Sequence, residues 1–254
     1  MILPCEPLTG LPSASPSQAD EASIDIWWWP HGGNVDWREG RFALSEDERK
    51  RAEAFRFDRD AAAFAAGRHL QRCALSTYMR TPPVDLMFTT GKRGKPALVV
   101  PYGQQQIAFN LSNTQELAVV AVSRDCETVG IDAEPTTARI EPQAASFFCS
   151  TDEKATLSRL EGDEHQQLLL SYWVLKESFL KANGTGLVEE LHQINVRVDP
   201  QRPVIRVGNG LDDAASWHHR LLTAPGHLVA VSAKSNRANL RFLQFETQAP
   251  DARQ

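Results

Sequence analysis

The segment that most constrains this chain is Trp173-Val-Leu-Lys-Glu-Ser-Phe-Leu-Lys181, which places Glu177 and Lys181 one helical turn apart. At about 100° per residue, the positions around Glu177 are apolar on nearly every side, so the pattern predicts a helix that is buried on both sides. An unpaired carboxylate in such a place costs on the order of several kcal/mol. Glu177 therefore needs either an ion pair with Lys181 or a metal ion.

A second acidic group lies upstream in Val129-Gly-Ile-Asp-Ala-Glu-Pro135. Alternation along a strand sends Asp132 and Glu134 to one face and the apolar residues between them to the other. An ordinary solvated strand edge is one interpretation of this pair. Combined with Glu177, however, the pair supplies three oxygen ligands without a Cys or His in the motif, a set that favours Mg²⁺ over Zn²⁺. Magnesium in such sites usually shares a phosphate-bearing substrate, which Lys181 would contact as a point charge.

Together these segments resemble the surfactin-type 4′-phosphopantetheinyl transferases. The family pattern Gly-Ile/Val-Asp-x-Glu is matched by residues 130–134, and its Trp-x-x-Lys-Glu-Ser/Ala-x-x-Lys pattern by residues 173–181. Three further family elements follow the expected order: Gly94-Lys-Pro96, Phe109-Asn-Leu-Ser112 and Gly184-Thr-Gly-Leu187. The motifs span about 90 to 187, and weaker similarity in helix pattern extends from about 40 to 235.

The resemblance implies an internally duplicated α+β fold, pseudo-two-fold, with antiparallel sheets, packed helices and an active site between the halves. It also implies transfer of 4′-phosphopantetheine from coenzyme A to a serine of an apo acyl or peptidyl carrier protein, with Mg²⁺ as cofactor and 3′,5′-ADP as the leaving product. Such an enzyme is a holo-[acyl-carrier-protein] synthase that serves fatty-acid, polyketide or nonribosomal-peptide carriers.

The resemblance assigns a role to each candidate site residue. Mg²⁺ would be held by Asp132, Glu134 and Glu177. Lys181 would contact the pyrophosphate, and Glu177 would accept the serine proton directly or through a metal-bound water; with Asp132 these form the expected catalytic group. The residues expected around coenzyme A are Arg59 for the 3′-phosphate, Lys95 and Pro96 for the adenine, and Ser112, Asn113, Asp132, Glu177 and Lys181 for the phosphates.

Two positions depart from the family pattern. The family has His where this chain has Asn113, so a chargeable donor becomes a neutral amide with a weaker bond to phosphate. In the first long helix, aligned through Gly67, the family places basic residues where this chain has Asp58, Arg59 and Ala63. These departures keep open a catalytically weakened relative that binds coenzyme A or a carrier without efficient transfer. A magnesium-dependent phosphatase or nucleotide hydrolase with the same carboxylates is a further alternative.

The rest of the chain is expected to form two α+β halves, 23–125 and 126–247, between flexible tails at 1–22 and 248–254. Each half carries a capping box, Ser45-Glu-Asp-Glu48 or Ser150-Thr-Asp-Glu153, then a longer helix, 60–79 or 165–182, and a late strand, 117–123 or 228–232. Because the duplication places both halves in one chain, we expect a monomer. Further strands are predicted at 24–29, 107–110, 129–134, 194–198, 204–207 and, in pieces, 217–232.

Composition limits the classes of partner and the cellular compartment that we expect for this chain. A net charge of −5 and a pI near 5.8 argue against a general nucleic-acid binder. Four scattered cysteines without a CxxC pattern predict neither a disulfide framework nor a zinc site, which favours the cytoplasm. We expect no membrane span, because no apolar run approaches ~18 residues, and no signal peptide. Trp27-Trp-Trp29 is expected in the core and between the halves.

Overall fold

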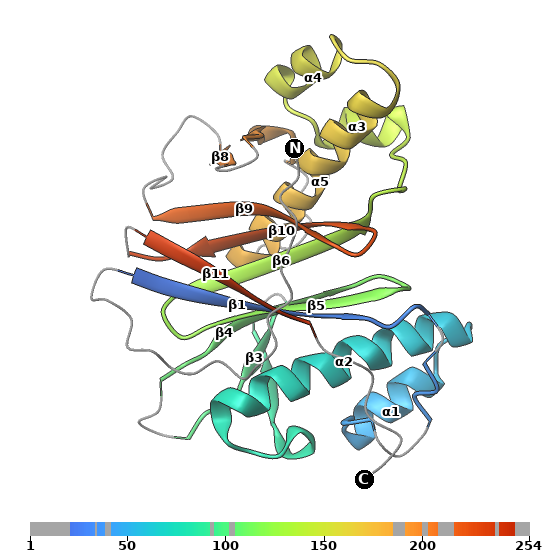
Figure 1. Cartoon of the computed structure of the whole chain (residues 1–254), viewed down its shortest axis with the longest axis vertical. Coiled ribbons are helices and arrows are strands. Elements are labelled where there is room, and N and C mark those ends of the chain that lie inside the picture. Colours follow the sequence, from blue (N-terminus) through green and yellow to red (C-terminus); the bar gives the residue numbers. More distant parts are fainter. Residues whose placement is uncertain are drawn as a thin grey trace.

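The computed structural model describes residues 21–33, 35–38, 42–91, 94–101, 105–184, 191–199, 203–207, 216–236 and 239–246. Its main elements stack in four layers (Figure 1): helix α2 (Asp58–Met79) with α1 (Glu46–Glu53), a four-stranded sheet, a three-stranded sheet, and helix α5 (Gly162–Asn183). The α+β prediction is confirmed. Residues 1–20 of the expected tail 1–22, and the whole of the expected tail 248–254, lie outside the described residues.

The first sheet has the order β11-β1-β5-β4. Its strands are β1 (Glu21–Pro30), β4 (Ala108–Asn113), β5 (Leu117–Ser123) and β11 (Asn239–Glu246). The β1–β5 and β4–β5 pairs are antiparallel as predicted, whereas β1 and β11 pair in parallel, with Glu21 opposite Asn239. The sequence predicted neither β11 nor this pairing, which places a strand from the expected second half in the sheet of the first. Strand β1 also begins inside the expected tail, and Ala22 is buried.

The second sheet has the antiparallel order β6-β10-β9, with β6 (Thr128–Pro135), β9 (Trp217–Ala224) and β10 (His227–Lys234). Two small hairpins accompany the sheets, β2 (Phe88–Thr90) with β3 (Pro96–Leu98) and β7 (Ile194–Arg197) with β8 (Val204–Val207). The remaining helices are α3 (Pro142–Phe148), α4 (Thr151–Leu157) and the single 3₁₀ turns η1 (Pro83–Asp85) and η2 (Leu191–Gln193).

Of the described helices, none combines the length and apolarity that a bilayer crossing requires.

The three consecutive tryptophans show how the layers are held together. Trp27 and Trp29 belong to the apolar core that includes residues of α2, whereas Trp28 belongs to the core formed by residues of both sheets. This is the alternation expected of a strand with both faces buried, and it confirms the core and inter-half packing predicted for the segment. A third core lies between α5 and the second sheet.

The two predicted capping boxes both form, at Ser45 with Glu48 and at Ser150 with Glu153. In the second capping box, Glu153 also forms an ion pair of 2.7 Å with the fully buried ammonium group of Lys176 on α5. Lys176 also donates to the carbonyl oxygens of Phe148 and Leu191, so all three of its protons are used. The lysine within the Trp-x-x-Lys-Glu motif is therefore structural and joins α5 to α4. Helix α5 ends as expected at Gly184, which has a φ of 69°.

Candidate active site

The two sheets meet where their edge strands β4 and β6 run alongside each other. Side chains of β4, rather than a backbone ladder, join the edges: Asn110 Oδ1 accepts from the Ile131 amide at 2.9 Å, and Ser112 Oγ accepts from the Ala133 amide at 3.3 Å. Buried edge amides need such partners. The short polar residues of Phe109-Asn-Leu-Ser112 therefore close the seam between the halves.

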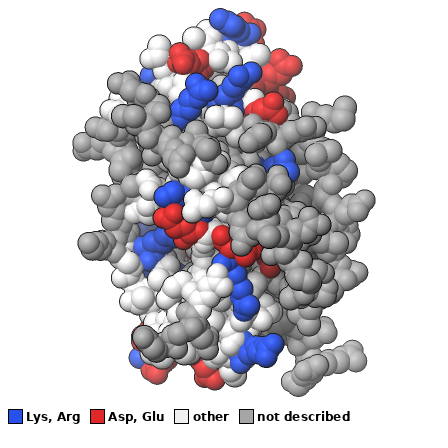
Figure 2. All heavy atoms as spheres, turned by 90° about the vertical axis from the view of Figure 1, so that its left-hand side faces the viewer, with Lys and Arg blue, Asp and Glu red and all other residues white. Residues whose placement is uncertain are grey.

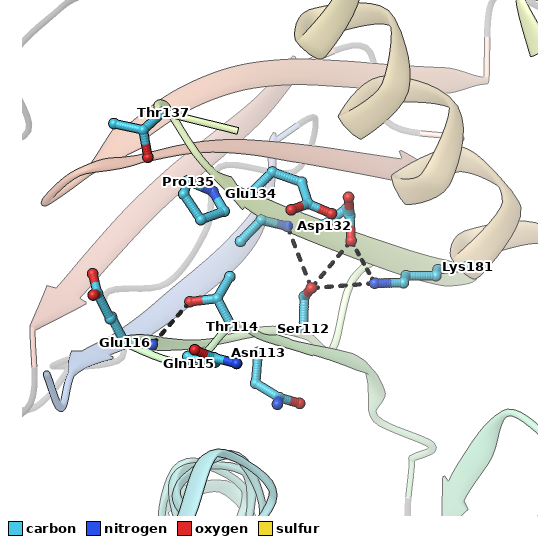
Figure 3. Close-up of a pocket in the computed structure, with 11 residues that line it drawn as sticks. Ser112, Asn113, Thr114, Gln115, Glu116, Asp132, Glu134, Pro135, Thr137 and Lys181 are labelled. Carbon is cyan, nitrogen blue, oxygen red and sulfur yellow. Dashed lines mark hydrogen bonds and ion pairs between the residues drawn. The ribbon is translucent and has the colours of Figure 1, made fainter. Parts of the chain in front are cut away.

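Three polar side chains from three elements converge at this seam (Figure 3). Lys181 Nζ of α5 lies 2.6 Å from Asp132 Oδ1 of β6 and 3.2 Å from Ser112 Oγ of β4. The Ser112 hydroxyl in turn donates to Asp132 Oδ1 at 3.1 Å. Lys181 therefore pairs with Asp132 and not with Glu177, so the helical ion-pair alternative is wrong. The solvated-edge interpretation is also wrong for Asp132, which is only 4% exposed because α5 and β4 cover it.

The remaining two carboxylates lie in the same electrostatic environment. Glu134 is half-buried and accepts a hydrogen bond of 3.3 Å from the indole nitrogen of Trp173. Burial and then the neighbouring charge of Asp132 raise the pKa of Glu134. Burial raises the pKa of Glu177 as well, with added contributions from Asp132 and Glu134 and partial opposition from Lys181. The charge of Asp132 thus disfavours the charged form of both glutamates, and Glu134 adds to this effect at Glu177.

Two buried oxygen atoms of this group, Asp132 Oδ2 and Glu177 Oε1, have no hydrogen-bond partner among the described residues. Buried carboxylate oxygens without hydrogen-bond partners are suitable ligands for a hard divalent cation, whose charge would stabilise them. Within the described part of the chain, no three His, Cys, Asp or Glu side chains are grouped closely enough to form a ready-made metal cluster. Asp132 Oδ1, moreover, is already bonded to Lys181. The donors fit magnesium in kind, and the metal assignment stays a prediction.

A pocket of about 530 Å³ opens beside these groups, within the usual size range of small-molecule sites. One wall is the turn after β4, and the opposite wall is the end of β6 (Figure 3). The lining residues are Ser112, Asn113, Thr114, Gln115, Glu116, Asp132, Ala133, Glu134, Pro135, Thr137 and Lys181. Sequence reasoning missed the turn residues and those after Glu134, although both stretches directly follow recognised motifs.

The Asn113 side chain points from this pocket toward α2 (Figure 3). It is so close to the helix that a Cβ atom on Gly67 would lie 3.3 Å from Asn113 Oδ1. Arg68 follows Gly67 on the helix, and the guanidinium groups of Arg68 and Arg51 both lie over the ring of Phe64. These two cations near one ring were not singled out in the sequence, because their proximity depends on the contact between α1 and α2.

Other predicted coenzyme residues lie elsewhere. Lys95 Nζ donates to Thr128 Oγ1 at 2.9 Å, to the Val129 carbonyl at 2.9 Å and to the Ala182 carbonyl at 3.0 Å. All its protons are thus used in joining β6 to the end of α5, and burial lowers the pKa of Lys95 to about 8. Arg59 is exposed, 3.7 Å from Asp60, and like Lys95 it does not line the pocket.

Pro96 begins β3 and is not part of the pocket lining either. Residues 185–187 of the predicted Gly-Thr-Gly-Leu element lie outside the described residues. Charged side chains of both signs are interspersed on the face shown in Figure 2, without a broad basic stripe among the described residues there.

Comparison with known proteins places these features in a family. Residues 128–232 match the model described as the 4′-phosphopantetheinyl transferase superfamily, and residues 28–125 match that of the 4′-phosphopantetheinyl transferase N-terminal region. The 4′-phosphopantetheinyl transferase HetI of Nostoc sp. is 33% identical over 192 residues, which cover 75% of this chain and 78% of that protein.

Other relatives align over smaller shares. The L-aminoadipate-semialdehyde dehydrogenase-phosphopantetheinyl transferase of Mus musculus is 31% identical, covering 68% of this chain and 58% of that protein. The 4′-phosphopantetheinyl transferase Sfp of Bacillus subtilis is 29% identical, covering 61% and 66%. The two family matches together with the HetI alignment establish that this chain belongs to the 4′-phosphopantetheinyl transferase superfamily and has the transferase activity that defines it.

Proposed function

We propose that the pocket at the β4–β6 seam binds the pyrophosphate region of coenzyme A and that 4′-phosphopantetheine is transferred from it to a serine of an apo acyl or peptidyl carrier protein. The observation that carries this assignment is the convergence of Ser112, Asp132 and Lys181, from three separate motifs, into one hydrogen-bonded group on the pocket wall. Their meeting point is also the seam between the two halves.

In the proposed reaction, the carrier serine oxygen forms a bond to the β-phosphorus of coenzyme A. The bond from that phosphorus to the bridging oxygen breaks, and 3′,5′-ADP leaves. Glu177 takes the serine proton, a role suited by the raised pKa that burial and Asp132 give it. Lys181 neutralises charge on the pyrophosphate as a compact cation held at the pocket by Asp132. Positioning and charge neutralisation are the main contributions that such a transfer needs.

Magnesium belongs to this proposal. Asp132, Glu134 and Glu177 would hold the ion, which when bound would stabilise negative charge on the phosphate oxygens during transfer. The orphaned oxygens Asp132 Oδ2 and Glu177 Oε1 support this assignment. The Trp173 indole, which donates to Glu134, would keep that carboxylate oriented.

For the 3′-phosphate of the coenzyme, we favour Arg68 with Arg51 over the predicted Arg59. Arg68 is adjacent to Gly67, which contacts the pocket residue Asn113, whereas Arg59 lies about two turns further toward the start of α2. The two guanidinium groups lie near one ring, and burial and, to a smaller extent, the charge of Arg51 lower the pKa of Arg68. A bound phosphate would relieve that repulsion. A single chain supplies every residue of the proposed site, so the proposal includes a monomer, acting in the cytoplasm as the cysteine pattern favours.

The test is intact-mass spectrometry of apo carrier proteins incubated with this protein, coenzyme A and Mg²⁺, using one fatty-acid carrier and one peptide-synthetase carrier. A phosphopantetheine-sized mass gain that EDTA abolishes is the expected result. The catalytically weakened alternative, which Asn113 favours, instead predicts no gain on either carrier while calorimetry still detects coenzyme binding. Release of 3′,5′-ADP in the absence of any carrier would indicate a hydrolase and overturn the proposal.

A further inference from the structure

His227 is connected to both walls of the pocket. It begins β10, where its backbone is in register with Pro135 on the β6 wall. Its imidazole is only 2% exposed and reaches the opposite wall, with Nε2 placed 2.9 Å from Thr114 Oγ1. A residue of the second half thus holds the side chain of a pocket residue in the first half.

The hydrogen bonds define which ring nitrogen carries the proton. Nδ1 of His227 lies 2.7 Å from the carbonyl oxygen of Pro225, which only accepts, so Nδ1 must donate. In the neutral ring Nε2 is then the acceptor. The Thr114 hydroxyl donates to it at 2.9 Å in preference to the Leu117 carbonyl oxygen, which lies 3.4 Å away. The same hydroxyl oxygen accepts from the amides of Leu117 at 3.0 Å and Glu116 at 3.2 Å. The donor and both acceptor sites of Thr114 are therefore in use.

This arrangement controls the shape of the turn between β4 and β5. Asn113 to Glu116 line the pocket, and the bonds of Thr114 to the Glu116 and Leu117 amides close the turn. A second contact supports the turn from the segment that follows β1, where the Gly32 amide donates to the Glu116 carbonyl at 3.1 Å. The bond to His227 fixes the turn relative to the second half, where the opposite wall lies.

We infer that His227 is a positioning residue that sets the spacing between the two pocket walls by holding Thr114, and through this spacing sets the affinity for coenzyme A. The inference rests on the proposed assignment of the pocket to the coenzyme. Neither Thr114 nor His227 needs to touch the reacting atoms for this role. The effect is expected on coenzyme binding and only weakly on the chemical step.

Two matched pairs of variants test this role. Thr114→Val removes the hydroxyl at nearly constant shape, whereas Thr114→Ser keeps it. His227→Asn keeps an amide near the Nδ1 position, facing Pro225, but loses the acceptor for Thr114; His227→Gln places an amide oxygen near the Nε2 position. We expect Thr114→Val and His227→Asn each to raise the KM and the calorimetric Kd for coenzyme A about fivefold, with kcat nearly unchanged, as one lost neutral hydrogen bond implies.

Rescue and coupling distinguish this role from a general loss of stability. Thr114→Ser and His227→Gln are expected to retain most of the affinity, and the Thr114→Val/His227→Asn double variant to be no weaker than either single one, because both remove the same bond. Lower thermal stability with an unchanged KM and Kd in Thr114→Val and His227→Asn would overturn the inference.

Lys181→Met separates this inference from the proposal on which it depends. Lys181 lines the same pocket, and its hydrogen bonds within the described residues go to Ser112 and Asp132 and not to His227. If Lys181→Met weakens coenzyme binding while Thr114→Val and His227→Asn do not, the positioning role is refuted and the pocket assignment stands. If Lys181→Met leaves the calorimetric Kd at the wild-type value, the pocket is not the coenzyme site, and the proposed function fails at that point.

Discussion

Gly130 of β6 lies directly against the backbone of Ser178 on α5. A Cβ atom added to Gly130 would lie 2.1 Å from the Ser178 carbonyl oxygen and 2.3 Å from the Ala182 amide nitrogen. The glycine is required here for space and not for a left-handed conformation, since its φ is not positive. Because the helix can rest on the strand, Lys181 reaches Asp132, and the two acidic motifs form one site.

The first prediction concerns this contact. Gly130→Ala should destabilise the protein by roughly 3 kcal/mol or more, because the atoms that the methyl group would meet are backbone atoms that cannot rotate away. Urea unfolding followed by fluorescence measures the change. Gly226→Ala is not a suitable control because its φ is positive. Ala133→Gly, on the same strand, gives the combined cost of losing one buried methyl group and gaining backbone freedom in the unfolded chain. A Gly130→Ala protein as stable as the wild type would contradict the close packing.

Glu177→Gln should abolish transfer while leaving the fold intact. The variant loses both the proposed base and a proposed metal ligand, so activity should fall by at least ~10²-fold. Its thermal stability should equal or exceed that of the wild type, because burial and neighbouring carboxylates already disfavour the charged form of Glu177. The measurements are mass gain of an apo carrier and a thermal melt. Near-normal activity would count decisively against the site.

Removal of divalent metal should stop transfer, and added Mg²⁺ should restore it. Asp132→Asn should raise the Mg²⁺ concentration needed for half-maximal activity, because it weakens a proposed ligand and also removes the charge paired with Lys181. Titration of activity with Mg²⁺ in metal-free buffer gives the concentration for half-maximal activity of the wild type and of Asp132→Asn. Full activity in excess EDTA would refute the role of the metal.

Asn113→His should restore a chargeable donor at the pocket wall. We expect the KM for coenzyme A to fall by roughly threefold to tenfold at pH 6 and less at pH 8, because only the protonated ring makes a charge-assisted bond. The space for the larger histidine ring is limited on one side, because Asn113 lies close to Gly67 on α2. An unchanged KM at both pH values would show that this position does not contact phosphate.

How far the sequence alone could predict this structure depends on the range of each signal. The capping boxes, the end of α5 at Gly184 and the shared face of Asp132 and Glu134, which line one pocket, are local patterns, and each was predicted correctly. Helical periodicity places Lys181 near Glu177, but it cannot reveal that Asp132 on another element lies closer.

The parallel β1–β11 pair and the Thr114–His227 bond join residues far apart along the chain. No local sequence motif indicates either contact, so both become visible only in the folded structure. Lys95 shows that a motif also cannot predict the contacts of a side chain. The family motif indicates a lysine at this position, but only the structure shows that its three protons are bonded to β6 and the end of α5.

His219 gives a prediction about pH. It is buried at 8% exposure, its Nδ1 lies 2.9 Å from Ser232 Oγ, and burial lowers its pKa to about 3. Because the folded pKa lies below the unfolded value of about 6.5, the unfolded chain binds the proton first, and stability is lost as pH falls from about 6.5 toward 3.

His219→Gln should remove this dependence. Between about pH 6 and pH 4, the wild type should lose about 1.4 kcal/mol per pH unit more than the variant, because groups that do not interact with His219 contribute equally to both proteins. Urea unfolding of both proteins at several pH values measures the two slopes. Parallel curves would show that His219 is not held neutral.

The pairing of β11 with β1 has a consequence for biosynthesis. A ribosome releases the first half of the chain long before residues 239–246, so during that interval β1 presents an open edge on one side. The nascent first sheet is therefore exposed to strand exchange with other chains until β11 emerges and covers that edge. The half that is synthesised first is completed last.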